Sequence, residues 1–298
     1  METVTSTGKH ALVVEGGAMR GIFASGVLDG FLQHHYHPFH FCLGVSAGST
    51  NLAAWLAGQQ ERNYRVITDY SCRPEFMRLG NFLRGGHWLD LDWLWEITIR
   101  EIRLDLETFA RQNTPLIVVT TAVSDGQARY IEATAENLEN LLKASCSVPL
   151  LYRDYPVING EAMTDGGVAD SIPVIRAYEM GARDITVVLS HPDGYCKGRS
   201  RAPWLIRRLL KDQPVLAQAL IRRADSYNRA MDFIRNPPAD CRIHRIAPPE
   251  AFPVGRLTRN THKLNTGYHM GLEAAKAVAQ AQPPGVVPAQ PATPSLQK

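Results

Sequence analysis

One serine in the sequence lies in a setting typical of a nucleophile. Ser46 belongs to a G-x-S-x-G pattern, Gly44-Val45-Ser46-Ala47-Gly48, which follows a short apolar run and precedes a helix-like stretch. A serine on a sharp turn between a strand and a helix exposes its hydroxyl, and the helix N-terminus behind it favours developing negative charge. The pattern therefore predicts a nucleophile, although a tight turn without a chemical role would use the same residues.

A second glycine-rich turn precedes this serine. The segment EGGAMRG (15–21) also follows a strand-like run and opens a helix-like one. Adjacent glycines let several backbone N–H groups converge on one point, as an oxyanion or a phosphate requires. A dinucleotide-binding loop would need glycine where the chain has Ala18, so we favour an oxyanion loop over nucleotide binding. A glycine turn that serves packing alone is the remaining alternative.

The base that such a serine needs is best supplied by Asp165. This aspartate precedes Gly166 and Gly167 after a short strand-like run, which places its carboxylate on an exposed turn. The histidine alternatives are His191 and His262, and neither lies in a glycine-flanked turn. The sequence therefore favours a serine–aspartate pair over a triad. An aspartate is a weak base at its reference pKa of about 3.9, so burial would have to raise that pKa.

The elements that must position these motifs are strands that alternate with helices. Apolar β-branched runs predict strands, and apolar residues at helical spacing predict helices. The expected strands are HALVVEGG (10–17), FHFCLGV (39–45), PLIVVTTAV (115–123), ARYIEA (128–133), PVI (156–158), DITVVLS (184–190) and RIHRIAP (242–248). The expected helices span 20–33, 47–58, 59–71, 105–112 with Asp105 as N-cap, 134–148, 172–181, 213–235 and 261–281, and 72–104 is expected to be irregular. Such alternation predicts an α/β fold, with helices on both faces of a mostly parallel sheet.

The three motifs, in this order, resemble the patatin-like phospholipase family. EGGAMRG, GVSAG and DGG carry the resemblance, and ASCSVPLLY (144–152) and DSIPV (170–174) also match the family pattern. The resemblance spans residues 10 to about 190 and is weak beyond 200. It implies a three-layer α/β/α sandwich of patatin type and an enzyme that cleaves carboxylic esters of lipids, such as phospholipids.

The resemblance also implies a role for each matching residue. Ser46 would be the nucleophile, and Asp165 would be a base bonded to it without an intervening histidine. The oxyanion hole would comprise the backbone N–H groups of Gly16, Gly17 and Ala18, with Arg20 supporting the loop. The flanking motif residues are Gly21, Gly44, Gly48, Gly166 and Gly167. The chain departs from the family by having Glu15 in place of aspartate and Ala18 in place of glycine, and Ala18 would strain the loop if it needed a positive φ.

The amino-acid composition indicates the general class of protein. The chain has 298 residues, 45% hydrophobic and 20% charged, which is ordinary globular composition, and its net charge of +3 is too small to indicate nucleic-acid binding. Five scattered cysteines indicate neither a zinc site nor a disulfide framework. Without a signal peptide or an apolar run of about 20 residues, we expect a soluble cytoplasmic protein. The expected organisation is a flexible N-terminus (1–9), one catalytic domain (10–281, with a helical C-terminal part from 200) and a disordered Pro/Ala-rich tail (282–298).

Three further stretches have a plain and a functional interpretation. The histidine-rich HHYHPFH (34–40) is better explained as a connector than as a metal site. The tryptophan-rich HWLDLDWLWEI (87–97) is expected to pack as core under a loop, with a lipid-facing wall as the alternative. PWLIRRLLKDQP (203–214) is expected to be a surface helix with its leucines packed inward, with contact to an anionic membrane surface as the alternative.

The function expected from the sequence is therefore hydrolysis of an acyl lipid or another ester through an acyl-serine. Neither a cofactor nor a metal is implied by a serine–aspartate pair, and no nucleic-acid partner is expected. Acyl transfer or thioester hydrolysis by the same pair, and lipid binding without catalysis, remain open. Headgroup, chain length and oligomeric state are not indicated, and any membrane contact would be peripheral.

Overall fold

A single sheet organises the part of the chain that the computed structural model describes, residues 8–281. The two terminal segments that we expected to be flexible or disordered lie outside these residues, apart from residues 8 and 9, and Lys9 already belongs to the first strand. The strands are β1 (Lys9–Val14), β2 (Phe41–Val45), β3 (Leu116–Ala122), β4 (Ala128–Glu132), β5 (Val157–Ile158), β6 (Glu161–Asp165), β7 (Ala182–Val188) and β8 (Arg242–Ile246).

The sheet is mixed and mostly parallel at its centre. Its order is β5-β6-β3-β2-β1-β7-β8, and β4 pairs with β3 beside this path. The pairs among β3, β2, β1, β7 and β8 are parallel, whereas β4 and β6 run antiparallel to β3. The expected α/β fold is confirmed, and the strand expected at 128–133 is present as β4.

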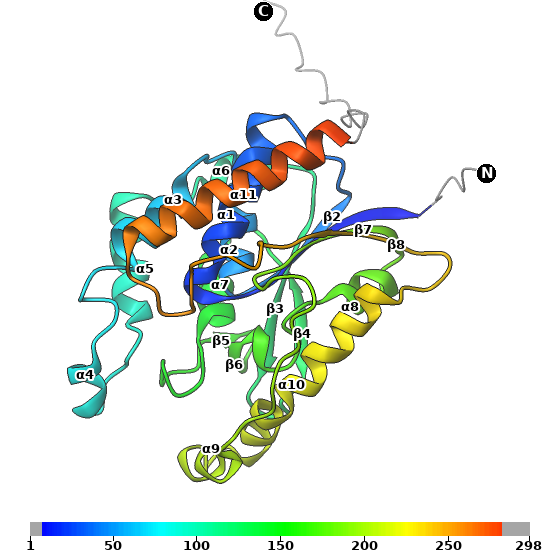
Figure 1. Ribbon diagram of the computed structural model, residues 1–298. Helices are drawn as coiled ribbons and strands as arrows, with labels where there is room; N and C mark the ends of the chain where they lie inside the picture. The colour runs from blue at the N-terminus through cyan, green and yellow to red at the C-terminus, as the bar shows by residue number, and fades with distance from the viewer. Residues whose placement is uncertain (1–7, 282–298) are drawn as a thin grey trace, which may run out of the picture.

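Helices cover both faces of the sheet (Figure 1). Alternate residues of β1 separate the two cores: Leu12 and Val14 belong to the cluster under α1, α2, α7 and α11, and Ala11 and Val13 to the cluster under α8 and α10. The helices are α1 (Ile22–Gln33), α2 (Ala47–Leu56), α3 (Arg62–Arg65), α4 (Leu79–Leu83), α5 (Leu91–Glu101), α6 (Leu106–Arg111), α7 (Leu138–Cys146), α8 (Val174–Glu179), α9 (Pro203–Leu209), α10 (Pro214–Arg235) and α11 (Thr261–Ala281), with the short 3-10 and π turns η1 (Ala18–Gly21), η2 (Val66–Tyr70) and η3 (Gly166–Val168).

The segment 72–104 was expected to be irregular, and this is wrong, because it contains α4 and α5. Asp90 caps α5 by accepting a hydrogen bond from Trp93 N at 3.0 Å. Leu91, Leu94 and Ile97 are buried at helical spacing. The exposed Asp92, Glu96 and Arg100 lie on the other side, so the helix is amphipathic, a pattern that the sequence already carried.

The leucines of α9 were expected to pack inward, and this is also wrong. No residue of α9 is buried, and the side chains of Trp204, Leu205 and Leu209 are 65%, 39% and 55% exposed. The inward position is taken by Leu210, which follows the helix and is buried. In Figure 1, α9 lies at the lower end of the molecule, beside the start of α10. Among the described residues, no helix has both the length and the apolar composition to span a membrane.

Candidate active site

Ser46 lies at the end of β2 and immediately before α2. Its backbone has φ 51° and ψ −126°, a conformation that a residue with a Cβ rarely adopts. The strained turn lifts the side chain off the sheet at the N-terminus of α2, and its hydroxyl lines an apolar cavity. The strand–turn–helix context predicted for this serine is therefore present.

The glycines around Ser46 allow backbones to approach the turn. A Cβ on Gly44 would lie 2.6 Å from Ser49 Cα, and a Cβ on Gly48 would lie 2.4 Å from Val14 O. Both distances are shorter than atoms tolerate, so a side chain at either position would push α2 away from the sheet. Glycine is needed here for space, as the motif suggested.

A second serine, which the sequence did not single out, holds the turn in place. Ser145, near the end of α7, accepts a hydrogen bond from Ser46 N at 2.8 Å and donates one to Val119 O at 2.7 Å. Ser145 is fully buried, so both bonds are shielded from water. The only hint in the sequence was its place in ASCSVPLLY, a segment noted there for its resemblance alone.

Asp165 lies at the end of β6 and faces Ser46. The Ser46 side chain hydrogen-bonds to the Asp165 carboxyl group, whose Oδ1 also accepts from Gly167 N at 2.7 Å. Burial raises the pKa of Asp165, and the hydrogen bonds from Ser46 and Gly167 oppose this in part. A Cβ on Gly166 would lie 2.2 Å from Val119 O, so glycine is required where the chain turns beside β3.

Neither alternative base contacts the serine in the described part of the chain. His191 is buried, stacks on Tyr195 with ring centroids 4.0 Å apart, and has Nδ1 3.5 Å from Glu15 Oε1. Burial lowers the pKa of His191. His262 is exposed in the first turn of α11.

The loop at Gly16, Gly17 and Ala18 runs beside the serine. A Cβ on Gly16 would lie 3.0 Å from Ser46 Cβ, and Ala18 lines the same apolar cavity as Ser46. Within residues 8–281, none of the three backbone N–H groups donates to a protein acceptor. Unpaired donors next to the hydroxyl suit an oxyanion. Ala18 has φ 50°, the positive value that was expected to strain the loop.

Arg20 and Glu15 anchor this loop to the end of β7. Arg20 Nε donates to Ser190 O at 2.6 Å, and its Nη1 donates to Val254 O at 3.0 Å. Glu15 Oε2 accepts from Ser190 N at 2.6 Å. All three hydrogen bonds are to backbone atoms, so the two charged side chains hold the loop in position. Gly21, after Arg20, has its carbonyl bonded by Asn51 Nδ2 at 2.8 Å.

The apolar cavity beside Ser46 is built largely by the segment that was expected to be irregular. Leu91, Leu94, Trp95 and Ile99 of α5 line it, together with Leu142 of α7. Trp93 and Trp95 are only partly buried and pack against the cluster of α5 and its neighbours. The tryptophan-rich stretch is therefore core on one side and a cavity wall on the other.

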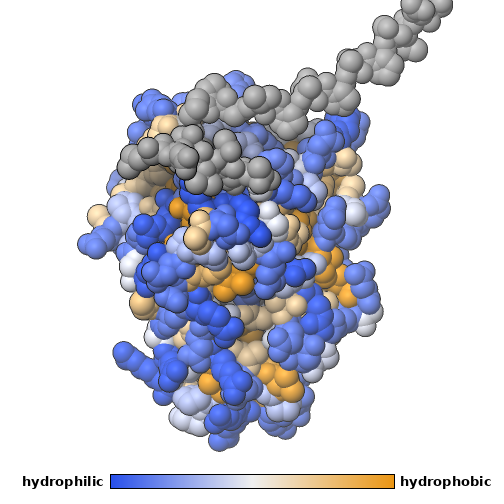
Figure 2. All heavy atoms as spheres, turned by 90° about the vertical axis from the view of Figure 1, so that its right-hand side faces the viewer, coloured by the Kyte–Doolittle hydropathy of each residue, from blue (hydrophilic) through white to orange (hydrophobic). Residues whose placement is uncertain are grey.

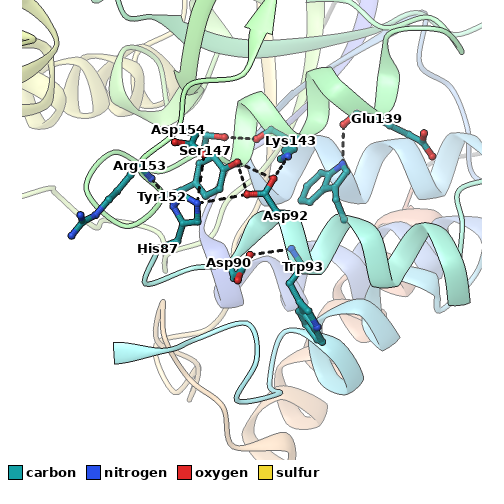
Figure 3. A network of polar contacts seen from close by, with 11 residues as sticks. His87, Asp90, Asp92, Trp93, Glu139, Lys143, Ser147, Tyr152, Arg153 and Asp154 are labelled. Atoms are coloured by element: carbon teal, nitrogen blue, oxygen red, sulfur yellow. Dashed lines mark hydrogen bonds and ion pairs between the residues drawn. The ribbon is translucent and has the colours of Figure 1, made fainter. Parts of the chain in front are cut away.

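A polar network joins α5 to α7 (Figure 3). Asp92 is bonded by Lys143 and by Tyr152 Oη at 3.0 Å, and His87 Nε2 lies 3.6 Å from it. His87, Asp92 and Asp154 form the one metal-like group found among the described residues. Lys143 of α7 is the counter-ion of Asp92 of α5. We therefore interpret the group as a connection between the cavity wall and α7.

Comparisons with known proteins cover both halves of the chain. A family model described as patatin-like phospholipase matches residues 12–178, and a model for a domain of unknown function (DUF6363) matches residues 213–282. The uncharacterized protein YjjU of Escherichia coli (strain K12) is 33% identical over 271 residues, which cover 89% of this chain and 75% of YjjU. The crystal structure of VipD from Legionella pneumophila is 12% identical, with a TM-score of 0.46 over 92% of this chain and 67% of that chain. The first family model spans all three motifs, and the second begins one residue before α10.

Proposed function

The chain belongs to the patatin-like phospholipase family, and we propose that it is a serine hydrolase that cleaves carboxylic esters of acyl lipids. The observation that carries the proposal is the contact between the Ser46 hydroxyl and the buried Asp165 carboxyl group, beside a loop with unpaired N–H groups. The proposed nucleophile, base and oxyanion donors then lie on three neighbouring turns at the end of the sheet.

The reaction begins with attack of Ser46 Oγ on the ester carbonyl, while Asp165 accepts the hydroxyl proton. The negative charge that forms on the carbonyl oxygen is stabilised by the N–H groups of the loop at 16–18, and one such donor is typically worth about 3–4 kcal/mol. The alcohol leaves with the proton held by Asp165. A water molecule, activated by the same carboxylate, then hydrolyses the acyl-serine.

The apolar cavity supports an acyl chain as the group that is transferred. Side chains of α5 and α7 contribute to its walls, and most of its lining surface is apolar. Burial of apolar surface contributes roughly 25 cal/mol per Å², so each methylene of a chain in this cavity adds affinity. A small polar ester would gain none of this.

Replacement of either member of the pair tests the proposal. We expect Ser46→Ala and Asp165→Asn each to abolish hydrolysis of a p-nitrophenyl acyl ester, because the first removes the nucleophile and the second the proton acceptor. Thermal melting should stay close to that of the parent protein. Asp225→Asn, which changes an exposed aspartate of α10, is the matched control and should retain activity. Full activity of Asp165→Asn would contradict the pair and favour His191.

Transfer of the acyl group to another alcohol, or hydrolysis of a thioester, is open to the same residues. An added acceptor alcohol distinguishes transfer from hydrolysis, because transfer yields a new ester and hydrolysis yields only free acid. Lipid binding without catalysis is the alternative in which the strained Ala18 leaves the loop unable to stabilise an oxyanion. It predicts bound lipid that is recovered intact.

The exposed apolar residues of α9 support peripheral contact with an anionic membrane. Trp204, Leu205 and Leu209 project from this helix, with the exposed Arg207 and Arg208 between them. Figure 2 shows hydrophobic side chains among hydrophilic ones towards the lower end of the molecule, the end at which α9 lies in Figure 1. A lipid surface buries such apolar side chains and attracts the neighbouring cations.

A further inference from the structure

A second cavity, lined by cations, lies beside the active site. It encloses about 540 Å³ between the segment that follows β7 and the helix α10. Its walls carry the side chains of Arg20, Lys197, Arg223 and Arg256. A water molecule occupies about 30 Å³ in the liquid, so the cavity has room for a phosphate group together with several waters.

The positive charge in this cavity is poorly compensated. Among the described residues, none of the four cations forms an ion pair with a carboxylate. Arg223 Nε is buried without a hydrogen-bonding partner, and Lys197 Nζ lies 4.1 Å from the centre of the Tyr227 ring. Burial and the charges of Arg223 and Arg256 lower the pKa of Lys197 to about 7. An anion in the cavity would supply the missing counter-charge.

Hydrogen bonds to the main chain hold two of the four residues, Lys197 and Arg20, in position. The main chain of Lys197 is fixed to α10 by Asn228, which accepts from Lys197 N at 2.8 Å and donates to Lys197 O at 3.0 Å. Arg20 is fixed by Ser190 O and Val254 O. The carboxyl groups that act on Lys197 are Glu15 and Asp165, and both are already hydrogen-bonded to backbone N–H groups.

The cationic cavity adjoins the apolar one next to the catalytic pair. Arg256 lines both cavities, and the charges of Arg223 and Arg256 partly oppose the rise that burial causes in the pKa of Asp165. An ester whose carbonyl lies at Ser46 and whose acyl chain fills the apolar cavity therefore directs its alcohol portion towards the four cations.

We propose that the cationic cavity binds a phosphate group on the alcohol portion of the substrate, so that the enzyme prefers acyl esters with an anionic phosphate headgroup. The inference rests on the proposed function and deepens it. Arg223 and Arg256 belong to residues 213–282, the segment matched as a domain of unknown function. That segment would thus select the substrate for the catalytic residues of the N-terminal part.

An anionic phosphate suits this cavity better than a zwitterionic headgroup. Guanidinium groups match phosphate oxygens in a forked geometry, and charge-assisted hydrogen bonds are about twice as strong as neutral ones. A choline group would add a positive charge beside three arginines and Lys197. The Tyr227 ring, which might have attracted it, already has Lys197 against it.

Three soluble substrates with one acyl chain test the preference. They are octanoyl-glycerol 3-phosphate, octanoyl-glycerophosphocholine and monooctanoylglycerol, and kcat/KM is measured for each below its aggregation concentration. We expect the phosphomonoester to exceed monooctanoylglycerol by about tenfold or more, since one hydrogen bond to a charged group is worth roughly that factor. Arg223→Gln should lower this ratio about tenfold, and Arg223→Lys should restore part of it.

The matched control is Arg222→Gln, which removes an exposed charge one residue away on α10 and should leave the ratio unchanged. Thermal melting of each variant shows whether it is folded. Equal kcat/KM values for the three substrates in the parent protein would overturn the proposal. A preference that survives Arg223→Gln in a folded protein would overturn it as well.

Binding to the Ser46→Ala protein separates this inference from the proposed function. Tighter calorimetric binding of octanoyl-glycerol 3-phosphate than of monooctanoylglycerol supports the subsite even if the parent protein hydrolyses no ester. Hydrolysis without any such preference sustains the hydrolase and rejects the subsite. Binding of inorganic phosphate alone, with no preference between the two lipids, would indicate a site for free phosphate and contradict the headgroup assignment.

Discussion

Two residues of the candidate site, Ser46 and Ala18, hold positive φ angles of 51° and 50° although neither is glycine. A left-handed conformation costs an L-residue roughly 1–2 kcal/mol. Such strain persists only where the surroundings enforce it, and here Ser145 fixes Ser46 while Arg20 fixes the loop of Ala18. Both strained residues lie where a carbonyl oxygen and its nucleophile would meet.

Removing the Cβ at position 18 should relieve part of this strain. We expect Ala18→Gly to raise the free energy of unfolding by roughly 0.5–1 kcal/mol, because glycine adopts positive φ without a steric penalty. Denaturant unfolding measures the change. The control Ala110→Gly, at an exposed position of α6, should lower the free energy of unfolding by about 1 kcal/mol. A comparable loss in Ala18→Gly would show that Ala18 is not strained.

At the scale of elements, α11 joins the C-terminal part of the chain to the part that carries Ser46 and Asp165. It packs against α1 so closely that a Cβ on Gly26 would lie 2.1 Å from Tyr268 O. Tyr268 Oη also donates to the buried Asp29 carboxylate at 2.8 Å. Burial raises the pKa of Asp29 from 3.8 to about 6, with the Tyr268 hydrogen bond opposing the shift.

This shift makes the contact between α1 and α11 sensitive to pH. Asp29 binds its proton more tightly in the folded protein than in the unfolded chain. The free energy of unfolding is therefore highest below pH 3.8, falls between pH 3.8 and about pH 6 as the carboxyl group ionises, and stays at the lower value above pH 6. The decline is about 3 kcal/mol from the two pKa values. We expect Asp29→Asn to lack this decline in unfolding experiments at several pH values. Asp212→Asn, at an exposed position, should keep it, and a parallel pH profile for Asp29→Asn would contradict the account.

The elements that the sequence predicted best are those with strong local signals. The β-branched run of β3, the Asp105 cap of α6 and the long periodic pattern of α10 each appear where expected. The contact between Ser46 and Asp165 was predictable because glycine spacing marks both turns. Helix α5 was mispredicted although its residues form an amphipathic pattern, and the exposed leucines of α9 were mispredicted because local sequence does not show what a helix will pack against. Ser145 and the cationic cavity depend on contacts between distant segments.

For the whole molecule, the apolar cavity, the proposed catalytic pair, the cationic cavity and α9 together define a proposed path for a lipid. Ile206 of α9 lines the cationic cavity, so the exposed apolar helix lies next to the proposed headgroup site. Contact of α9 with a bilayer would bring that site close to lipid headgroups. The product of the reaction could then leave without crossing bulk water.

Removal of the apolar side chains of α9 should weaken membrane binding. We expect Trp204→Ala combined with Leu209→Ala to reduce co-sedimentation with anionic vesicles at least about tenfold, since each side chain buries apolar surface worth more than 1 kcal/mol. Higher salt should weaken binding of the parent protein. The control is Val157→Ala, which shortens a 58% exposed residue of β5. Unchanged binding of the double variant would exclude α9 as the contact surface.

Labelling with a fluorophosphonate, followed by mapping of the modified peptide, tests the central claim most directly. The account predicts one adduct, on Ser46, that is absent from Ser46→Ala and strongly reduced in Asp165→Asn. An adduct on another residue, or a folded protein that is not labelled at all, would contradict the assignment of Ser46 as the nucleophile.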